Sequence, residues 1–158
     1  MKNYYSCLDA GFVKYVPQSL QHLANGEKAK KLGGKIIFYT AEDFKTLPSH
    51  GVIKAKMDEK QTNINGIIFF TLRQFFYGGH FDYKFLKYVL DEGYEVHFAR
   101  EDISVDNQAR LDEFFPIFYA TQYVIRRDEA KSSWQHLLEP YERYDRKQII
   151  FKELNNVR

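Results

Sequence analysis

Polar side chains that suit phosphate or sugar binding follow the short apolar runs of this sequence. Four groups lie at or just after the carboxyl ends of four predicted strands: Lys14, Tyr15, Gln18 and Gln21; Thr40, Glu42 and Asp43; Arg73; and His97, Arg100 and Glu101. In an open parallel sheet the carboxyl ends of the strands share one edge, where helix N-termini also present free N–H groups. We therefore expect these side chains to line one binding site, with Lys14, Gln18, Arg73, Arg100 and Glu101 converging on a single cleft.

The side-chain types indicate a role for each group. Arg73 emerges beside Phe75-Phe76-Tyr77, a setting that suits phosphate or carboxylate recognition, and Lys14 adds a second cation. Tyr15 would line the pocket with its ring, while Gln18 and Gln21 would exchange hydrogen bonds with hydroxyl groups.

His97 and Glu101 are the candidate acid/base pair, and Thr40 and Glu42 would complete the binding surface. His97 also fits a half-buried structural histidine, because it alternates with Val96 and Phe98. Asp43 and Asp102 equally fit helix caps or surface charges.

Several common chemistries are absent from the sequence. The five histidines lack metal-ligand spacing, and GxGxxG, GxxxxGK[ST] and GxSxG do not occur, so we expect neither a metal nor a cofactor. Cys7 is the single cysteine and is expected as a small buried thiol at or near the first strand. The start of the chain has no apolar leader and no run of 18 apolar residues exists, which predicts a cytoplasmic protein without a membrane span.

The bulk composition indicates a globular protein of one domain, residues 1–158. The chain has 158 residues, of which 44% are hydrophobic and 28% charged, and its net charge of +2 is too small to indicate nucleic-acid binding by itself. Partners must therefore be identified from local sites.

Apolar runs recur at intervals of about 25 to 30 residues, each followed by a polar turn and a stretch with helical spacing. This rhythm predicts an α/β fold with a mostly parallel four- to five-stranded sheet flanked by helices, and a core within about residues 8–105. Strands are expected at about 10–16, 35–40, 67–71 and 93–98. The first helix, after Pro17, would pack through Leu20, Leu23 and Ala24, and a second would begin at an N-cap Ser49.

The region after the last main strand, about residues 106–158, is predicted to be helical. Residues 106 to about 136 form a long aromatic helix in this prediction, which Pro116 should kink or divide. Its aromatic residues cover too wide a face for contact with one core: Phe114, Phe115, Phe118, Tyr119 and Tyr123. We therefore expect a homo-oligomer formed through residues 106–131.

Four segments, in order, resemble the catalytic domain of serine recombinases of the resolvase and invertase group. They are GFVKYVPQSLQ, IIFFTLRQ, VHFAREDISV and NQARLDEFFPIFYATQYVIRRDEA, and the resemblance covers about residues 8–131. It implies a resolvase-like fold. The sequence has Tyr15-Val16-Pro17 where the nucleophilic serine of that family would stand, and only Arg73 of its arginine-rich motif, so the resemblance does not imply the recombination reaction.

A second resemblance is to the sporadic carbohydrate cluster proteins, a family encoded among genes for surface-sugar biosynthesis. VPQSLQHL, INGIIFFTLRQF and EVHFAREDI are similar to that family over about residues 11–125. The resemblance implies a pathway and leaves the reaction undefined.

Together these observations predict a protein of surface-carbohydrate biosynthesis that binds or converts a small anionic sugar metabolite, such as a sugar phosphate or a nucleotide sugar. The alternative is a degenerate recombinase-like module that binds DNA or oligomerises. Whether the protein turns over a substrate, and which one, stays open at this level.

Overall fold

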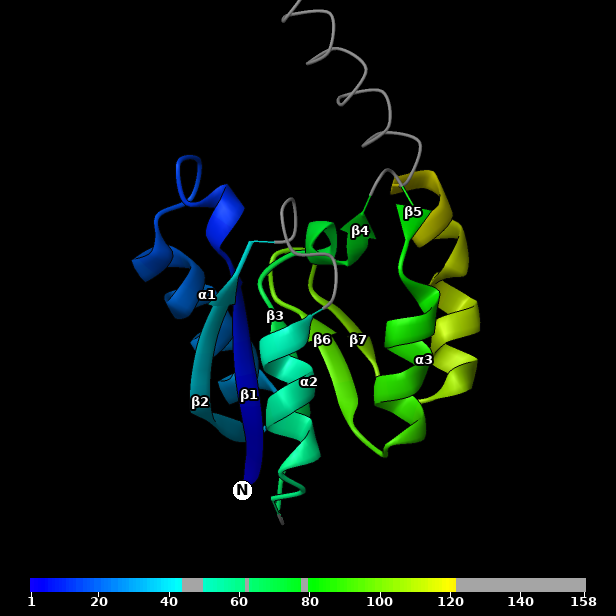
Figure 1. Cartoon of the computed structure of the whole chain (residues 1–158), viewed down its shortest axis with the longest axis horizontal. Coiled ribbons are helices and arrows are strands. Elements are labelled where there is room, and N and C mark those ends of the chain that lie inside the picture. Colours follow the sequence, from blue (N-terminus) through cyan, green and yellow to red (C-terminus); the bar gives the residue numbers. More distant parts are fainter. Residues whose placement is uncertain (44–49, 62, 78–79, 122–158) are drawn as a thin grey trace, which may run out of the picture.

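The computed structural model describes residues 1–43, 50–61, 63–77 and 80–121, and its centre is a five-stranded sheet in the order β2-β1-β3-β6-β7 (Figure 1). The strands are β1 (Lys2–Asp9), β2 (Gly34–Glu42), β3 (Gly66–Phe69), β6 (Glu95–Phe98) and β7 (Ile103–Val105). The first four are parallel, and β7 runs antiparallel to β6. A separate antiparallel pair joins β4 (Phe76–Tyr77) to β5 (His80–Phe81). The expected α/β class with a mostly parallel sheet is confirmed.

Helices cover both faces of the sheet. Helix α1 (Gln18–Lys31) lies on one face, and α2 (Gly51–Asp58), α3 (Tyr83–Asp91) and a helix of residues 108–121 lie on the other (Figure 1). Two short 3-10 helices, η1 (Ala10–Phe12) and η2 (Leu72–Phe75), follow β1 and β3. The 108–121 helix continues through Pro116, so of the predicted kink or division at this residue the division does not occur. Ser49 and residues 122–136 lie outside the described residues.

The first strand lies earlier than its predicted position at about residues 10–16. It spans Lys2–Asp9 and buries every side chain from Tyr4 to Asp9. The apolar residues that follow instead form η1 and a turn. The sequence misleads here because β1 begins and ends with polar residues, at Lys2, Asn3 and Asp9, whereas the segment after it is rich in β-branched and aromatic residues, which favour strands.

Most of the core lies on the α2/α3 face of the sheet. Phe69 and Phe98 of the strands pack there with side chains of α2, α3, η2 and the 108–121 helix, among them Phe75 and Phe118. A much smaller cluster of Tyr4, Ala29 and Ile68 lies on the α1 face. Strand β3, buried along its whole length, is the central strand that its continuous apolar run predicts.

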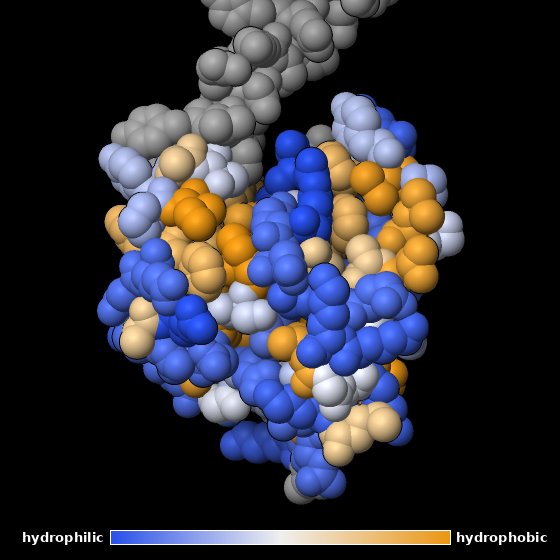
Figure 2. All heavy atoms as spheres, turned by 180° about the vertical axis from the view of Figure 1, so that it is seen from behind, coloured by the Kyte–Doolittle hydropathy of each residue, from blue (hydrophilic) through white to orange (hydrophobic). Residues whose placement is uncertain are grey.

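The orientation of α1 is opposite to the predicted one. Leu20 and Leu23 are 53% and 60% exposed, whereas Gln21 and Asn25 are buried against the sheet. Asn25 Nδ2 donates to the Ser6 hydroxyl at 2.9 Å and to the Ile68 carbonyl at 3.2 Å. The helix therefore contacts the sheet through hydrogen bonds as well as through Ala29, while Leu20 and Leu23 are exposed. Figure 2 shows the molecule from this side, with apolar groups at the upper left and upper right and hydrophilic side chains between them.

Candidate functional site

Two arginines that follow different strands lie over the same aromatic ring. The guanidinium carbons of Arg73 and Arg100 are each 5.3 Å from the centroid of the Phe12 ring. Arg73 follows β3, Arg100 follows β6 and Phe12 follows β1, so the carboxyl ends of three strands meet here. Among the described residues, no carboxylate lies within ion-pairing distance of either guanidinium. Two guanidinium groups that lack a carboxylate partner are suited to binding an anion.

The backbone around the two arginines is held by hydrogen bonds. The Arg100 N–H donates to the carbonyl of Phe70 at 2.8 Å, which continues the β3–β6 pairing past the end of the strands. Arg73 lies in η2, whose N-terminus is closed by a capping box between Thr71 and Gln74. Both arginines therefore start from fixed backbone positions.

Glu101 supports this edge of the sheet. One carboxylate oxygen accepts from the Thr71 hydroxyl at 2.7 Å, and the other accepts from the Leu72 N–H at 3.1 Å. The negative charge at the first turn of η2 satisfies an otherwise unpaired N–H. Glu101 is thus positioned as a helix cap beside the arginines.

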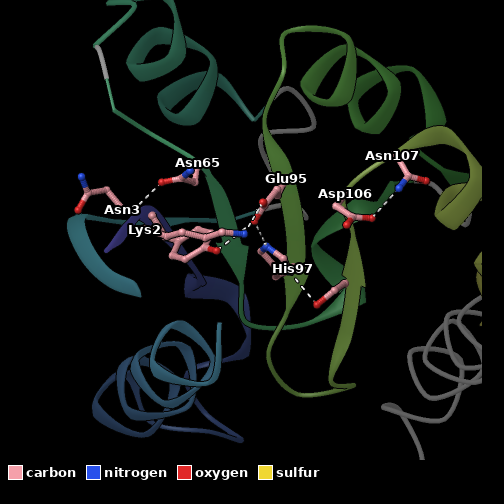
Figure 3. A network of polar contacts seen from close by, with 9 residues as sticks. Lys2, Asn3, Asn65, Glu95, His97, Asp106 and Asn107 are labelled. Carbon is pink, nitrogen blue, oxygen red and sulfur yellow. Dashed lines mark hydrogen bonds and ion pairs between the residues drawn. The ribbon is translucent and has the colours of Figure 1, made fainter. Parts of the chain in front are cut away.

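His97 belongs to a different polar network on the α1 face of the sheet (Figure 3). Its Nδ1 is 2.8 Å from the Ser104 hydroxyl, and its Nε2 is 3.0 Å from a Glu95 carboxylate oxygen. Within the described residues, His97 and Glu101 share no hydrogen bond and have different polar partners. Burial lowers the pKa of His97, although the adjacent Glu95 carboxylate opposes this change.

Glu95 is the centre of that network. Its carboxylate accepts from Lys2 Nζ at 2.7 Å and from the Tyr4 hydroxyl at 3.0 Å, in addition to His97 (Figure 3). Burial by itself would raise the pKa of Glu95, but these hydrogen bonds together hold the pKa below its usual value. The network joins β1 to β6 at their amino ends, away from the arginines.

Lys14 and Tyr15 lie in the turn between η1 and α1 and extend the site. The Tyr15 ring is 5.2 Å from the Phe12 ring, and Lys14 Nζ is 4.9 Å from the Tyr15 centroid. Both side chains are exposed, as is Gln18 in the first turn of α1. Lys14, Tyr15, Arg73 and Arg100 thus form one continuous group of cations and rings, which we call the Phe12 cluster because Phe12 is its centre.

Three other predicted binding residues, Gln21, Glu42 and Thr40, are buried or half-buried. Gln21 is buried and binds the backbone of Asp9 and Val16. Glu42 is buried, and its carboxylate accepts from the Val52 N–H in the first turn of α2 at 2.9 Å. Thr40 is half-buried in β2 opposite Cys7. Gln21 and Glu42 therefore bind backbone groups near the carboxyl edge of the sheet, and Thr40 is part of β2 there.

Asp43 and Asp102, for which the sequence left open a helix cap or a surface charge, each lie next to another described residue. Asp102 adopts a left-handed conformation with φ of 54° and pairs with Lys28 Nζ at 2.8 Å. Asp43 lies beside Gly11, where an added Cβ would come within 2.9 Å of its carboxylate oxygen. Cys7 is buried in β1, as predicted, and burial raises the pKa of its thiol.

The sequence analysis missed Phe12, because it assigned this residue to the interior of a strand. Its neighbours in the sequence could have indicated it, because Phe12 precedes the pair Lys14-Tyr15 and aromatic rings next to cations are typical of cation–π sites. The distant partners Arg73 and Arg100 are brought to the ring only by the strand order.

Within the described part of the chain, His, Cys, Asp and Glu side chains form no group of three or more that would hold a metal ion. None of the helices in that part has the length and apolar character needed to cross a bilayer.

Comparison with protein-family models gives no match, and comparison with curated proteins gives none either. The structure is similar to the crystal structure of a resolvase family site-specific recombinase from Streptococcus pneumoniae, with a TM-score of 0.58 and 11% sequence identity. The similarity covers 88% of this chain and 100% of that chain. At this low identity the similarity concerns the fold alone, which is therefore resolvase-like.

Proposed function

We propose that this protein is a recombinase-like module that binds phosphate groups at the carboxyl edge of its sheet and forms no covalent bond to DNA. The observation that supports phosphate binding is the position of Arg73 and Arg100 over the Phe12 ring, at 5.3 Å each. Guanidinium groups present several donors in a plane and are suited to phosphate oxygens. A phosphate would supply the counter-charge that neither guanidinium has among the carboxylates of the described residues.

The serine positions support the absence of a covalent step. Residues 9–16, which follow or end β1, contain no serine. Ser6 is fully buried within β1 and its hydroxyl accepts from Asn25. Ser19 lies in the first turn of α1, beyond Pro17. The edge therefore has the arginines to bind a phosphodiester but lacks the serine nucleophile with which serine recombinases would attack it.

A small anionic sugar metabolite, such as a sugar phosphate or nucleotide sugar, is the second candidate ligand. The compactness of the Phe12 cluster favours it, because the cluster has three cations whereas duplex binding commonly uses a long track of phosphate contacts. Acidic side chains also lie on the same edge, at Glu42, Asp43 and Glu101. They would repel an extended polyanion more than a single phosphate group.

Two measurements on the full chain test these candidates. Duplex DNA binding through the arginines should weaken steeply with salt, whereas a nucleotide sugar should raise the melting temperature in the absence of DNA. Arg73→Ala and Arg100→Ala should each remove the response, and Arg110→Ala, an exposed arginine paired with Glu113, should leave it unchanged. Equal binding by wild type and both site variants would contradict the proposed site.

A further inference from the structure

We infer that the phosphate held by Arg73 and Arg100 belongs to a nucleotide whose unpaired base stacks at Tyr15. This inference rests on the proposed phosphate site and adds the chemical class of the ligand. Its sources are a free nucleotide, including a nucleotide sugar, and a nucleotide within a single strand of nucleic acid. The shared chemistry is a planar base joined through a sugar to a phosphate.

The first observation is the exposure of Tyr15. This ring is 63% exposed, although it lies next to Phe12 at the centre of the site. Its described ring contacts are with Phe12 at 5.2 Å and with Lys14 Nζ at 4.9 Å, so most of its surface is available. An exposed aromatic ring beside cations is the combination with which proteins bind unpaired bases.

The second observation is that the backbone under Tyr15 is fixed before any ligand binds. The N–H groups of Tyr15 and Val16 both donate to the Phe12 carbonyl at 3.0 Å. The carbonyl of Val16 accepts from Gln21 Nε2 at 3.0 Å, which ties the turn to α1. A preorganised ring loses little conformational freedom on binding, so more of its contact energy contributes to affinity.

The third observation is the continuity between ring and cations. Phe12 contacts the Tyr15 ring and both guanidinium groups, of Arg73 and Arg100, so the Tyr15 ring and these cations share one neighbour. Lys14 has a flexible side chain that can leave the Tyr15 ring for a second phosphate. A sugar phosphate has no planar group for the ring, and a duplex conceals the faces of its bases. A nucleotide with an unpaired base can contact the Tyr15 ring through its base and the cations of the Phe12 cluster through its phosphate.

The test compares ligands that differ in one feature at a time. The full chain is titrated with oligothymidylate, with an abasic oligonucleotide of the same length and with the corresponding duplex. We expect the abasic strand and the duplex to bind more weakly than oligothymidylate, by roughly fivefold to a hundredfold, from the contribution of stacking per base. Equal affinity for the abasic strand would overturn the inference.

Variants separate this inference from the proposed phosphate site. Tyr15→Ala should abolish the preference for the strand with bases and leave binding of the abasic strand unchanged, while Tyr15→Phe should keep the preference. Arg73→Ala should weaken both strands. Arginine-dependent binding without a preference for bases would refute base stacking alone, whereas binding unaffected by Arg73→Ala would refute the phosphate site and with it the inference.

The source of the nucleotide is identified by adding thymidine monophosphate and ribose 5-phosphate. If the mononucleotide binds as tightly as oligothymidylate, the ligand is a free nucleotide; if affinity grows with strand length, it is a single strand. Ribose 5-phosphate should bind more weakly than the mononucleotide, and equal binding of the two would count against stacking.

Discussion

Gln21 binds both backbone groups of Asp9: its Oε1 accepts from the Asp9 N–H at 2.9 Å, and its Nε2 donates to the Asp9 carbonyl at 3.1 Å. These bonds occupy the backbone groups at the last residue of β1. They also fasten the segment that bears Phe12 and Tyr15 to α1. A buried glutamine on the inner side of a helix therefore positions the candidate site.

Gln21→Leu should destabilise the protein even though it places an apolar side chain in a buried position. The backbone groups of Asp9 and Val16 would lose their partners, which we expect to lower the free energy of unfolding by about 1–3 kcal/mol. Denaturant unfolding measures this effect. The control is Leu20→Gln on the exposed side of α1, which should change stability by no more than about 0.5 kcal/mol. The opposite ranking of the two variants would mean that α1 packs through its leucines.

Stability should fall as the pH is lowered from about 6.5 to about 4. His50 is buried and stacks on the Phe85 ring at 4.1 Å; this burial lowers its pKa to about 4 from 6.5. Between these pH values the unfolded chain binds more protons than the folded protein, so protonation favours unfolding as the pH decreases. The full effect is at most about 3 kcal/mol and is measured by urea unfolding across this pH range.

His50→Asn is the matched variant for this pH dependence. His50 has a φ of 47°, a left-handed conformation that asparagine tolerates and most residues do not. The variant should lose most of the slope between pH 6.5 and 4. A smaller slope should remain, because burial also lowers the pKa of His97. An unchanged slope in His50→Asn would assign the titration to other groups.

Glu101→Ala should lower the stability of the protein. The Thr71 hydroxyl and the Leu72 N–H both donate to this carboxylate, so its removal leaves the start of η2 without its cap. We expect a loss of about 1–3 kcal/mol in the free energy of unfolding. Glu113→Ala, in an exposed pair with Arg110, is the control and should have little effect. A Glu101→Ala protein of wild-type stability would speak against the capping role.

Self-association is expected through the helix that begins at residue 108. Phe115, Ile117 and Tyr119 are each nearly half exposed on this helix, with Ile117 at 45%. Ile117→Lys should shift the protein towards the monomer in analytical ultracentrifugation, since burying a charge at an apolar contact is unfavourable. Ala41→Lys, exposed on β2, should not. A wild-type chain that is already monomeric at tens of micromolar would contradict self-association.

No covalent adduct with DNA is expected from this protein. After incubation with supercoiled or nicked DNA, a denaturing gel should show the free chain only. Tyr15→Phe and Ser19→Ala should behave on DNA as the wild type does, because neither hydroxyl has a role in the proposed binding. An adduct that disappears in either variant would establish a recombinase-type reaction.

The sequence by itself was sufficient to predict the repeating pattern of strands and helices and to identify the residues that follow each strand. β3 could be recognised because its run is apolar on both faces, and α1 could be placed because Pro17 and Gly33 mark its ends. Arg73 and Arg100 could be nominated since charged residues directly after buried strands lie at a sheet edge.

Tertiary structure alone decided which of these residues meet. Local pattern cannot show that α1 turns its leucines outward, because the partners of Gln21 and Asn25 are backbone groups and a hydroxyl on β1 and β3. Likewise, His97 and Glu101 are four residues apart but lie in different networks: the His97 side chain points to the α1 face, while Glu101 follows the strand and caps η2. The Phe12 cluster arises from the order of β1, β3 and β6, since hydrogen bonding between distant strands brings their ends together.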